Sequence, residues 1–334
     1  MRALRLESMT GGMKRLAAAD VPAPSPAAGE VLIAVEACGV CRTDLHLLDG
    51  EVSAREGVIP GHQVAGTVAA VGAGVTTLAV GDAVGVGWLA STCGACRFCT
   101  DGRENLCARA RFTGRDVDGG YAEQAIADAR FVFKLPDGLA PVDAAPLLCA
   151  GIIGYRSLRL SGIGPGGRLG LVGFGASAHL AAQVALAWGC EVYAFTREEH
   201  HRRLARELGA AWAGAAGDDP GVLLDAAVIF APAGELVPQT IARLDRGARL
   251  AVNAIHMTDI PSFPYETLYW ERSITSVANY TRRDAEEFLR LAAEIPVRAE
   301  VERYALEDAP AVLERLRAGQ VHGAAVLEVR QPSA

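Results

Sequence analysis

The sequence predicts an α/β protein with two domains, one rich in β-strands and one built on a doubly wound parallel sheet. The chain has 334 residues, which is long enough for two domains. Short β-branched runs separated by Gly, Pro and Asp fill the first 135 residues, whereas strands and helices alternate beyond about residue 150. Apolar residues make up 51% of the chain, enough for two sizeable cores.

The elements of both domains are expected in a fixed order. In the β-rich part we expect strands at residues 30–37, 64–71 and 82–86. In the alternating part we expect strands at residues 169–172, 191–195, 226–230 and 248–252, and helices at residues 179–188, 198–208 and 284–294. A last helix (309–317) and strand (324–329) are expected to return to the first domain. The predicted domains are therefore residues 1–150 with 290–334, and residues 151–289.

Composition excludes several classes of function. The net charge is −7 and the acidic residues are dispersed, which argues against a nucleic-acid-binding protein. The N-terminus lacks an apolar signal segment, and the Gly-rich stretch at residues 64–90 fits strands better than a membrane span. We therefore expect a cytoplasmic protein with no membrane partner, in which clustered cysteines bind metal rather than form disulfides.

The most specific motif is a run of four cysteines within one loop. Cys93, Cys96 and Cys99 follow a CxxCxxC pattern, and Cys107 comes shortly after. Four thiolates satisfy a tetrahedral zinc ion completely and leave no position for substrate. The sequence therefore predicts a structural zinc site, with reactive or disulfide-bonded thiols as the alternative.

Three further residues offer zinc ligands in separate segments. Cys41 lies in Gly-Val-Cys-Arg-Thr-Asp-Leu-His, His62 in Pro-Gly-His-Gln, and Cys149 in Leu-Leu-Cys-Ala-Gly. Three protein ligands leave a fourth position for water or substrate, which is typical of a catalytic zinc. Spacing alone does not join them, and the Cys-x-x-Cys formed by Cys38 and Cys41 also allows a redox motif.

A Gly-rich turn predicts a dinucleotide site. It contains Gly173, Gly175, Ala176, Ser177 and Ala178, follows a predicted strand and opens a helix. The glycines permit a tight turn close to a pyrophosphate, and the helix N-terminus favours its negative charge.

The end of the next strand indicates the type of cofactor. Thr196 and Arg197 occupy the position where an enzyme that prefers NAD usually has an acidic residue. Because Thr and Arg can bind a 2′-phosphate, we predict NADP(H), with NAD as the alternative.

Together these motifs identify a family. Their sequence and order resemble the zinc-dependent medium-chain alcohol dehydrogenases over essentially the whole chain. The resemblance implies a GroES-like catalytic domain and a Rossmann domain, and it assigns Cys41, His62 and Cys149 to a catalytic zinc.

The resemblance also implies the roles of the residues around that zinc. Thr43 would bind the substrate oxygen, and His46 would pass its proton to solvent through the cofactor ribose. Arg42 would contact the pyrophosphate, and Asp44 would orient His62. One position departs from the family, since Gln63 stands where a glutamate usually follows the motif histidine. The neutral amide changes the charge around the metal.

We therefore expect reversible hydride transfer between NADP(H) and a primary or secondary alcohol, an aldehyde or a ketone, in a homodimer or homotetramer. Trp88 and Leu89 are candidate pocket walls. Two alternatives are a zinc-free relative that resembles quinone reductases and a non-catalytic NADPH-binding sensor, for which Gln63 is the only support.

Overall fold

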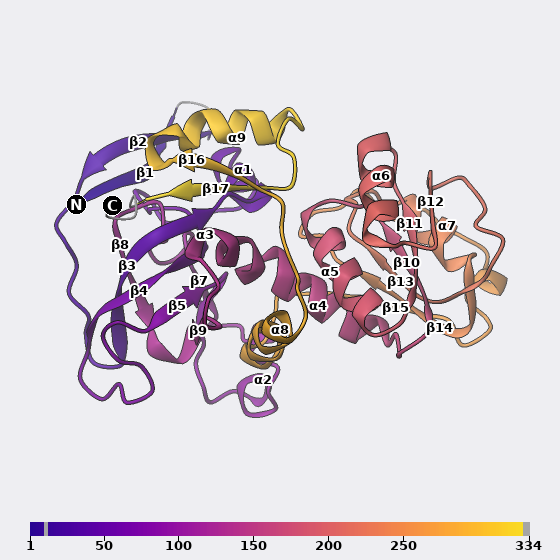
Figure 1. Ribbon diagram of the computed structural model, residues 1–334, viewed down its shortest axis with the longest axis horizontal. Coiled ribbons are helices and arrows are strands. Elements are labelled where there is room, and N and C mark those ends of the chain that lie inside the picture. Colours follow the sequence, from indigo (N-terminus) through magenta and orange to yellow (C-terminus); the bar gives the residue numbers. More distant parts are fainter. Residues whose placement is uncertain (10–12, 330–334) are drawn as a thin grey trace. The chain divides into compact units, whose positions relative to one another are not determined.

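The computed structural model describes residues 1–9 and 13–329 of the chain (Figure 1). The chain divides into two compact units by its internal contacts. Unit 1 comprises Met1–Cys149, Asn279–Ala293 and Arg298–Ala334, and unit 2 comprises Ala150–Ala278 and Glu294–Val297. No helix in the described part of the chain is both long and apolar enough to cross a membrane.

Unit 1 is built on a mixed, mainly antiparallel sheet with the strand order β16-β17-β3-β4-β5-β9, in which β8 also pairs with β3. Its strands are β3 (Glu30–Gly39), β4 (Gln63–Val71), β5 (Ala83–Val86), β8 (Gln124–Asp128), β9 (Val132–Lys134), β16 (Val301–Ala305) and β17 (Ala324–Glu328). The β3–β4 pair is unusually close at Gly66, where a Cβ would lie 2.1 Å from the carbonyl oxygen of Ala34. Strand β4 therefore needs a glycine at this position.

Smaller elements complete unit 1 around this sheet. They include the hairpin β1 (Arg2–Ser8) and β2 (Lys14–Asp20), the pair β6 (Leu89–Ser91) and β7 (Arg111–Phe112), and the helical segments α1 (Arg42–Leu48), α2 (Arg97–Thr100), η1 (Glu104–Leu106), η2 (Ala129–Phe131), α3 (Pro141–Ala144), η3 (Ala145–Leu148), η5 (Leu306–Asp308) and α9 (Ala309–Arg317). Helix α9 contacts α1 and β2, so the end of the chain supports the helix that follows β3.

Helix α8 (Arg282–Glu294) belongs almost entirely to unit 1. The buried Tyr280 just before it accepts a hydrogen bond from the backbone N–H of Leu89 at 3.3 Å. The backbone N–H and the side chain of Arg282 also donate to the buried Glu104 at 2.9 and 3.1 Å. These contacts hold the start of α8 against the loop that carries α2 and η1.

Unit 2 is a doubly wound parallel sheet with the strand order β12-β11-β10-β13-β14-β15. Its strands are β10 (Arg168–Val172), β11 (Glu191–Phe195), β12 (Trp212–Gly214), β13 (Leu224–Ile229), β14 (Leu244–Val252) and β15 (Ser273–Ser276). Its helical segments are α4 (Ala150–Ser161), α5 (Ala176–Ala187), α6 (Glu199–Leu208), α7 (Leu236–Ile241) and η4 (Tyr265–Thr267). Strand order reverses direction between β10 and β13, which is where such sheets bind ligands.

The predicted fold class is confirmed, and the differences are shifted element ends and elements that were not predicted. Helix α5 begins at Ala176 instead of residue 179, because Gly175 already serves as its N-cap. Strand β14 begins at Leu244 instead of residue 248, although Gly247 within it takes a φ of 76°. Strand β16 pairs with β17 although its sequence, Val-Glu-Arg-Tyr-Ala, has no apolar run.

Candidate active site and metal centres

Three segments of unit 1 bring Cys41, His62 and Cys149 together. Cys41 is the N-cap residue of α1, and His62 immediately precedes β4. Because Gly39 pairs with Gln63 across β3 and β4, these two strand ends lie next to each other. Cys149 follows η3. The ligand atoms of the three residues all lie within 4.8 Å of one another, with His62 Nε2 3.4 Å from Cys149 Sγ.

The donor set of this trio fits a zinc ion. Zinc bonds of about 2.3 Å to sulfur and about 2.1 Å to nitrogen separate two ligands of a tetrahedron by about 3.6 Å, close to the observed spacing. On the other side of the ring, His62 Nδ1 lies 3.8 Å from Asp44 Oδ1, and neither atom has a hydrogen-bond partner among the described residues. The ring thus presents Nε2 to the thiols and Nδ1 to a carboxylate, as a metal-bound histidine does.

Asp44 is held rigidly behind the trio. Its Oδ2 accepts hydrogen bonds from the backbone N–H of Cys41 at 2.8 Å and from the hydroxyl of Tyr121 at 3.2 Å. Burial raises the pKa of Asp44 to about 6. A hydrogen bond from Cys149, with further contributions from His62, keeps the pKa of the Cys41 thiol well below its usual range. The cluster thus favours a thiolate, the form that binds metal.

Helix α1 also carries the residues expected to act on substrate and cofactor. Thr43 is 4% exposed, with its Oγ1 3.6 Å from Cys41 Sγ. His46 lies one turn further along the same helix, where Nδ1 contacts the carboxylate of Glu51. Arg42, the first residue of α1, is exposed. The structure therefore brings Thr43 to the trio directly, while His46 follows on the same face of α1.

Gln63, the first residue of β4, is 5% exposed and packs against Gly39. A Cβ added at Gly39 would lie 2.7 Å from Gln63 Oε1, so the amide fills the space that this glycine leaves. The amide position is therefore fixed by packing beside His62. The amide carries no charge, so this position adds no carboxylate beside His62.

Trp88 and Leu89 have different roles. The Trp88 ring meets the His62 ring edge-on, with centroids 4.9 Å apart, and stacks on Phe112 at 5.2 Å. It therefore forms part of the immediate surroundings of the trio. Leu89 is fully buried in unit 1, so the prediction that it lines a pocket is wrong.

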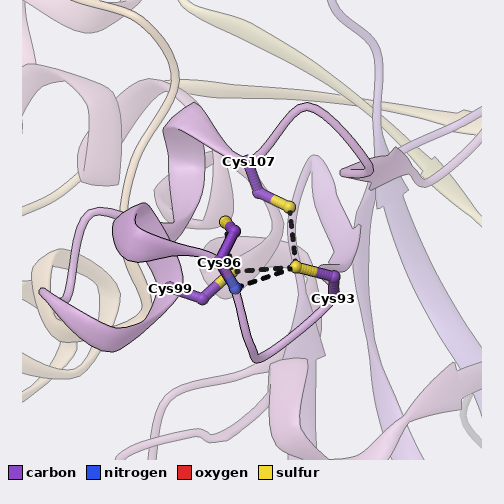
Figure 2. Close-up of side chains that lie close together, drawn as sticks. All are labelled: Cys93, Cys96, Cys99 and Cys107. Carbon is purple, nitrogen blue, oxygen red and sulfur yellow. Dashed lines mark hydrogen bonds between the residues drawn. The ribbon is translucent and has the colours of Figure 1, made fainter.

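The four cysteines of the predicted lobe converge on one point (Figure 2). Cys93 Sγ is 3.8 Å from Cys99 Sγ and 3.5 Å from Cys107 Sγ, and Cys96 Sγ is 3.5 Å from Cys99 Sγ. A tetrahedral ZnS₄ site with bonds of about 2.3 Å has sulfur–sulfur edges of about 3.8 Å, whereas a disulfide would need about 2.05 Å. All four thiols are free, and their spacing fits zinc.

Arg109 adds charge to this lobe. Backbone N–H groups of Ala95 and Cys96, together with the Arg109 side chain, lower the pKa of Cys93 to about 5. The backbone N–H of Arg109 also points at Cys107 Sγ, at 3.4 Å. The donors to Cys93 stabilise negative charge on its sulfur, so this cysteine favours the thiolate form.

In unit 2, the Gly-rich turn joins β10 to α5 at the switch point of the sheet. Gly173 has a φ of 84°, and a Cβ there would lie 2.9 Å from the backbone nitrogen of Ala231, which follows β13. Gly175 is the N-cap of α5, whose first turn contains Ala176, Ser177 and Ala178. Ala178 is fully buried, as the third small position of a dinucleotide fingerprint requires. The free N–H groups of the first turn of α5 suit a phosphate.

Thr196 and Arg197 follow β11 beside this turn. Thr196 is 7% exposed, and its N–H donates to the carbonyl of Gly214 at 2.8 Å. The guanidinium of Arg202 from α6 donates to the carbonyls of Thr196 at 3.0 Å and Arg197 at 2.6 Å. Arg197 itself is exposed. The end of β11 thus presents two guanidinium groups and no carboxylate from either position.

Sequence reasoning missed four residues of these sites. They are Glu51, Arg109, Tyr121 and Arg202. Arg109 and Glu51 could have been suggested by their closeness in sequence to a cysteine motif and to a candidate histidine. Arg202 lies only six and five residues after the two positions whose carbonyls it contacts, Thr196 and Arg197, so closeness in sequence could also have suggested it. Tyr121 gave no local signal, because its contact with Asp44 is made across the fold.

Known proteins are similar to this chain over most of its length. The model of the alcohol dehydrogenase GroES-like domain matches residues 27–137, and that of the zinc-binding dehydrogenase domain matches residues 178–294. A probable alcohol dehydrogenase from Mycobacterium tuberculosis is 50% identical over 95% of this chain and 93% of its own length. An alcohol dehydrogenase from Geobacillus stearothermophilus is 38% identical, over 95% and 97%.

Solved structures of alcohol dehydrogenases also have a similar fold. A cinnamyl alcohol dehydrogenase from Sorghum bicolor has a TM-score of 0.89 at 28% identity and covers 98% of this chain and 97% of its own. The alcohol dehydrogenase of Aeropyrum pernix has a TM-score of 0.87 at 30% identity, with coverage of 98% and 100%. The chain belongs to the zinc-type medium-chain alcohol dehydrogenase family. It is therefore an oxidoreductase of the alcohol dehydrogenase type.

Proposed function

We propose that this chain is a zinc-dependent enzyme that transfers hydride reversibly between NADP(H) and a primary or secondary alcohol, an aldehyde or a ketone. The observation that carries the proposal is the convergence of Cys41, His62 and Cys149, which offers three metal ligands and leaves one corner of a tetrahedron free. Cys93, Cys96, Cys99 and Cys107 would hold a second zinc that is purely structural.

When bound, the zinc held by the trio would supply Lewis acidity toward the oxygen of an alcohol or a carbonyl group. Thr43 would position that oxygen through its hydroxyl, accept its proton and donate its own toward His46. Asp44 would keep His62 oriented through Nδ1. In the direction of carbonyl reduction, each proton would move the opposite way.

The cofactor would lie along the turn of unit 2. Gly173 and Gly175 let the pyrophosphate approach the backbone, and α5 offers the N–H groups of its first turn. Arg42 would add a positive charge to the pyrophosphate. Arg197 and Thr196 support NADP(H) over NAD(H), because a guanidinium can bind a 2′-phosphate and an acidic residue is absent from both positions.

We further propose that the protein forms a homodimer or homotetramer. Unit 2 exposes an aromatic cluster, in which the Tyr265 and Tyr269 rings lie 5.9 Å apart and the Tyr269 and Trp270 rings 5.1 Å apart. These side chains are 72%, 59% and 46% exposed, respectively, and such patches mark interaction sites. Sedimentation of Trp270→Glu would test this, since a species no smaller than wild type would exclude the cluster as the contact.

Eight free cysteines support a reducing, cytoplasmic location.

Metal analysis combined with a substrate panel tests the proposed activity. We expect two zinc ions per chain in the purified protein, and one in Cys149→Ala, which should remain folded but lose turnover. Cys190→Ala serves as the matched control, because Cys190 is buried in unit 2, which holds neither cluster.

The panel should compare short aliphatic and benzylic alcohols and aldehydes with NADP(H) and NAD(H). One zinc or none, with activity intact in Cys149→Ala, would favour a zinc-free reductase. NADPH binding without turnover on any member would favour a sensor.

A further inference from the structure

Glu51 is brought back onto His46 by the turn that ends α1. Asp49 caps the helix, and Gly50 reverses the chain with a φ of 74°. The N–H of Val52 then donates to the carbonyl of His46 at 3.1 Å. This places the Glu51 carboxylate directly on His46 Nδ1.

The two acidic residues near His46 are used differently. Asp49 accepts hydrogen bonds from both terminal guanidinium nitrogens of Arg317 in α9, at 2.7 and 2.8 Å. These bonds hold the pKa of Asp49 below its usual range. Glu51 has no such cation among the described residues, and its contact is with the histidine ring. The charged groups that face His46 from α1 and α9 are therefore Asp49, already neutralised by Arg317, and Glu51.

The contact also separates the two sides of the ring. His46 is only 20% exposed at its side chain, whereas Glu51 is 52% exposed and faces water. With Nδ1 directed to Glu51, Nε2 is the nitrogen left to take a proton. A carboxylate that holds one ring nitrogen selects the tautomer of a catalytic histidine and stabilises the cation formed on protonation.

We propose that Glu51 is a positioning residue of the proton relay, a role that rests on the proposed function. It keeps the proton of neutral His46 on Nδ1, so that the lone pair of Nε2 accepts the proton released by alcohol oxidation. The ring then becomes a cation balanced by the carboxylate, and it returns to neutrality when Nε2 gives its proton to water. Glu51 itself exchanges no net proton.

A double-mutant cycle tests whether Glu51 acts through His46. Single-turnover oxidation of benzyl alcohol is measured with NADP⁺ and, in parallel, NAD⁺. We expect Glu51→Gln to lower the rate about tenfold, a small part of the roughly 10²–10⁴-fold that general acid–base catalysis supplies. In a His46→Gln background the same change should have no further effect. Asp49→Asn removes an equal charge nearby and should leave the rate within about twofold of wild type.

Nitrogen NMR of the zinc-loaded, cofactor-free protein gives a readout that does not depend on turnover. In the neutral form of the ring, His46 should carry its proton on Nδ1, and Glu51→Ala should shift the population toward Nε2–H. The His46→Gln spectrum identifies the signals.

Equal slowing by Glu51→Gln in both backgrounds, an effect of Asp49→Asn as large as that of Glu51→Gln, or an unchanged tautomer in Glu51→Ala would each overturn the proposal. A wild-type protein that oxidises no alcohol with either cofactor would instead contradict the proposed function, and the NMR result would still decide the role of Glu51.

Discussion

Replacing Asp44 by alanine should weaken both unit 1 and its metal site. The carboxylate is 1% exposed, and it accepts hydrogen bonds from Cys41 N–H at 2.8 Å and from Tyr121 at 3.2 Å. Truncation leaves the buried Tyr121 hydroxyl and the part-buried Cys41 N–H without this acceptor, at about 1–3 kcal/mol each. The expected loss is therefore about 2–6 kcal/mol, a large share of the roughly 5–15 kcal/mol that stabilises a typical protein.

The same substitution should loosen the metal. Asp44 Oδ1 is the polar atom that His62 Nδ1 faces, at 3.8 Å, and such outer partners are worth about 10–100-fold in metal affinity. Zinc release from the purified protein to a chromogenic chelator measures this effect. Urea unfolding followed by fluorescence and circular dichroism measures stability. Asp49→Ala is the control, since loss of its partly exposed ion pair with Arg317 should cost no more than about 1 kcal/mol.

The reasoning fails if Asp44→Ala unfolds at the same urea concentration as Asp49→Ala and keeps its zinc equally well. Asp44→Asn keeps the test decisive if the alanine variant does not fold. Its amide oxygen can still accept the hydrogen bond from Cys41, while the negative charge that faces His62 is lost. We expect stability close to wild type for this variant, with faster zinc release.

Three other predictions concern unit 2. Arg197→Gln should raise the Kd for NADPH about tenfold by calorimetry and leave that for NADH unchanged, because only the former has a 2′-phosphate; equal changes would contradict the assignment. Gly173→Ala should lower the urea concentration at the unfolding midpoint and weaken the binding of both NADPH and NADH. A φ of 84° costs an L-residue about 1–2 kcal/mol, and the added Cβ would lie 2.9 Å from the backbone nitrogen of Ala231. Unchanged cofactor binding would contradict this prediction. Hydrogen bonds from Arg168 keep the pKa of Asp225 in the folded protein below its usual 3.8. The carboxylate therefore stabilises the folded state at pH values above 3.8, and this contribution is lost as the pH falls through the lower pKa of the folded state. Asp225→Asn should therefore destabilise at pH 7, by less than about 1 kcal/mol because the pair is partly exposed, and the difference from wild type should vanish at strongly acidic pH.

The parts of the fold that the sequence predicted well are those set by local pattern. The buried runs of β10, β11 and β13 are almost purely apolar, as a parallel sheet covered on both faces requires. Strand β16 was missed because its residues are half-buried or exposed and form no apolar run, and its place in the sheet depends on β17, which is adjacent only in the folded chain. Pairing partners distant in sequence leave no local periodicity to find.

The two cysteine sites also differ in how far the sequence alone could predict them, because they are assembled differently. The four-cysteine loop lies within one short stretch of chain, so its spacing alone brings four sulfurs within reach of one ion. The trio of Cys41, His62 and Cys149 needs the register of β3 with β4 and the end of η3, and only family resemblance could join these residues beforehand.

This difference in assembly matches the chemistry that each site is proposed to perform. A loop that supplies all four ligands closes the coordination sphere and ties down a lobe with little core of its own. A site built from rigid strand and helix ends can hold three ligands fixed and leave the fourth direction free, because each ligand is oriented by its own element and not by the metal alone. In this chain, Asp44 extends that support to His62, and the turn after α1 extends it to His46. The precision of the proposed catalytic site therefore depends on residues that bind neither metal nor substrate, and substitutions at Asp44 and Glu51 should separate positioning from ligation.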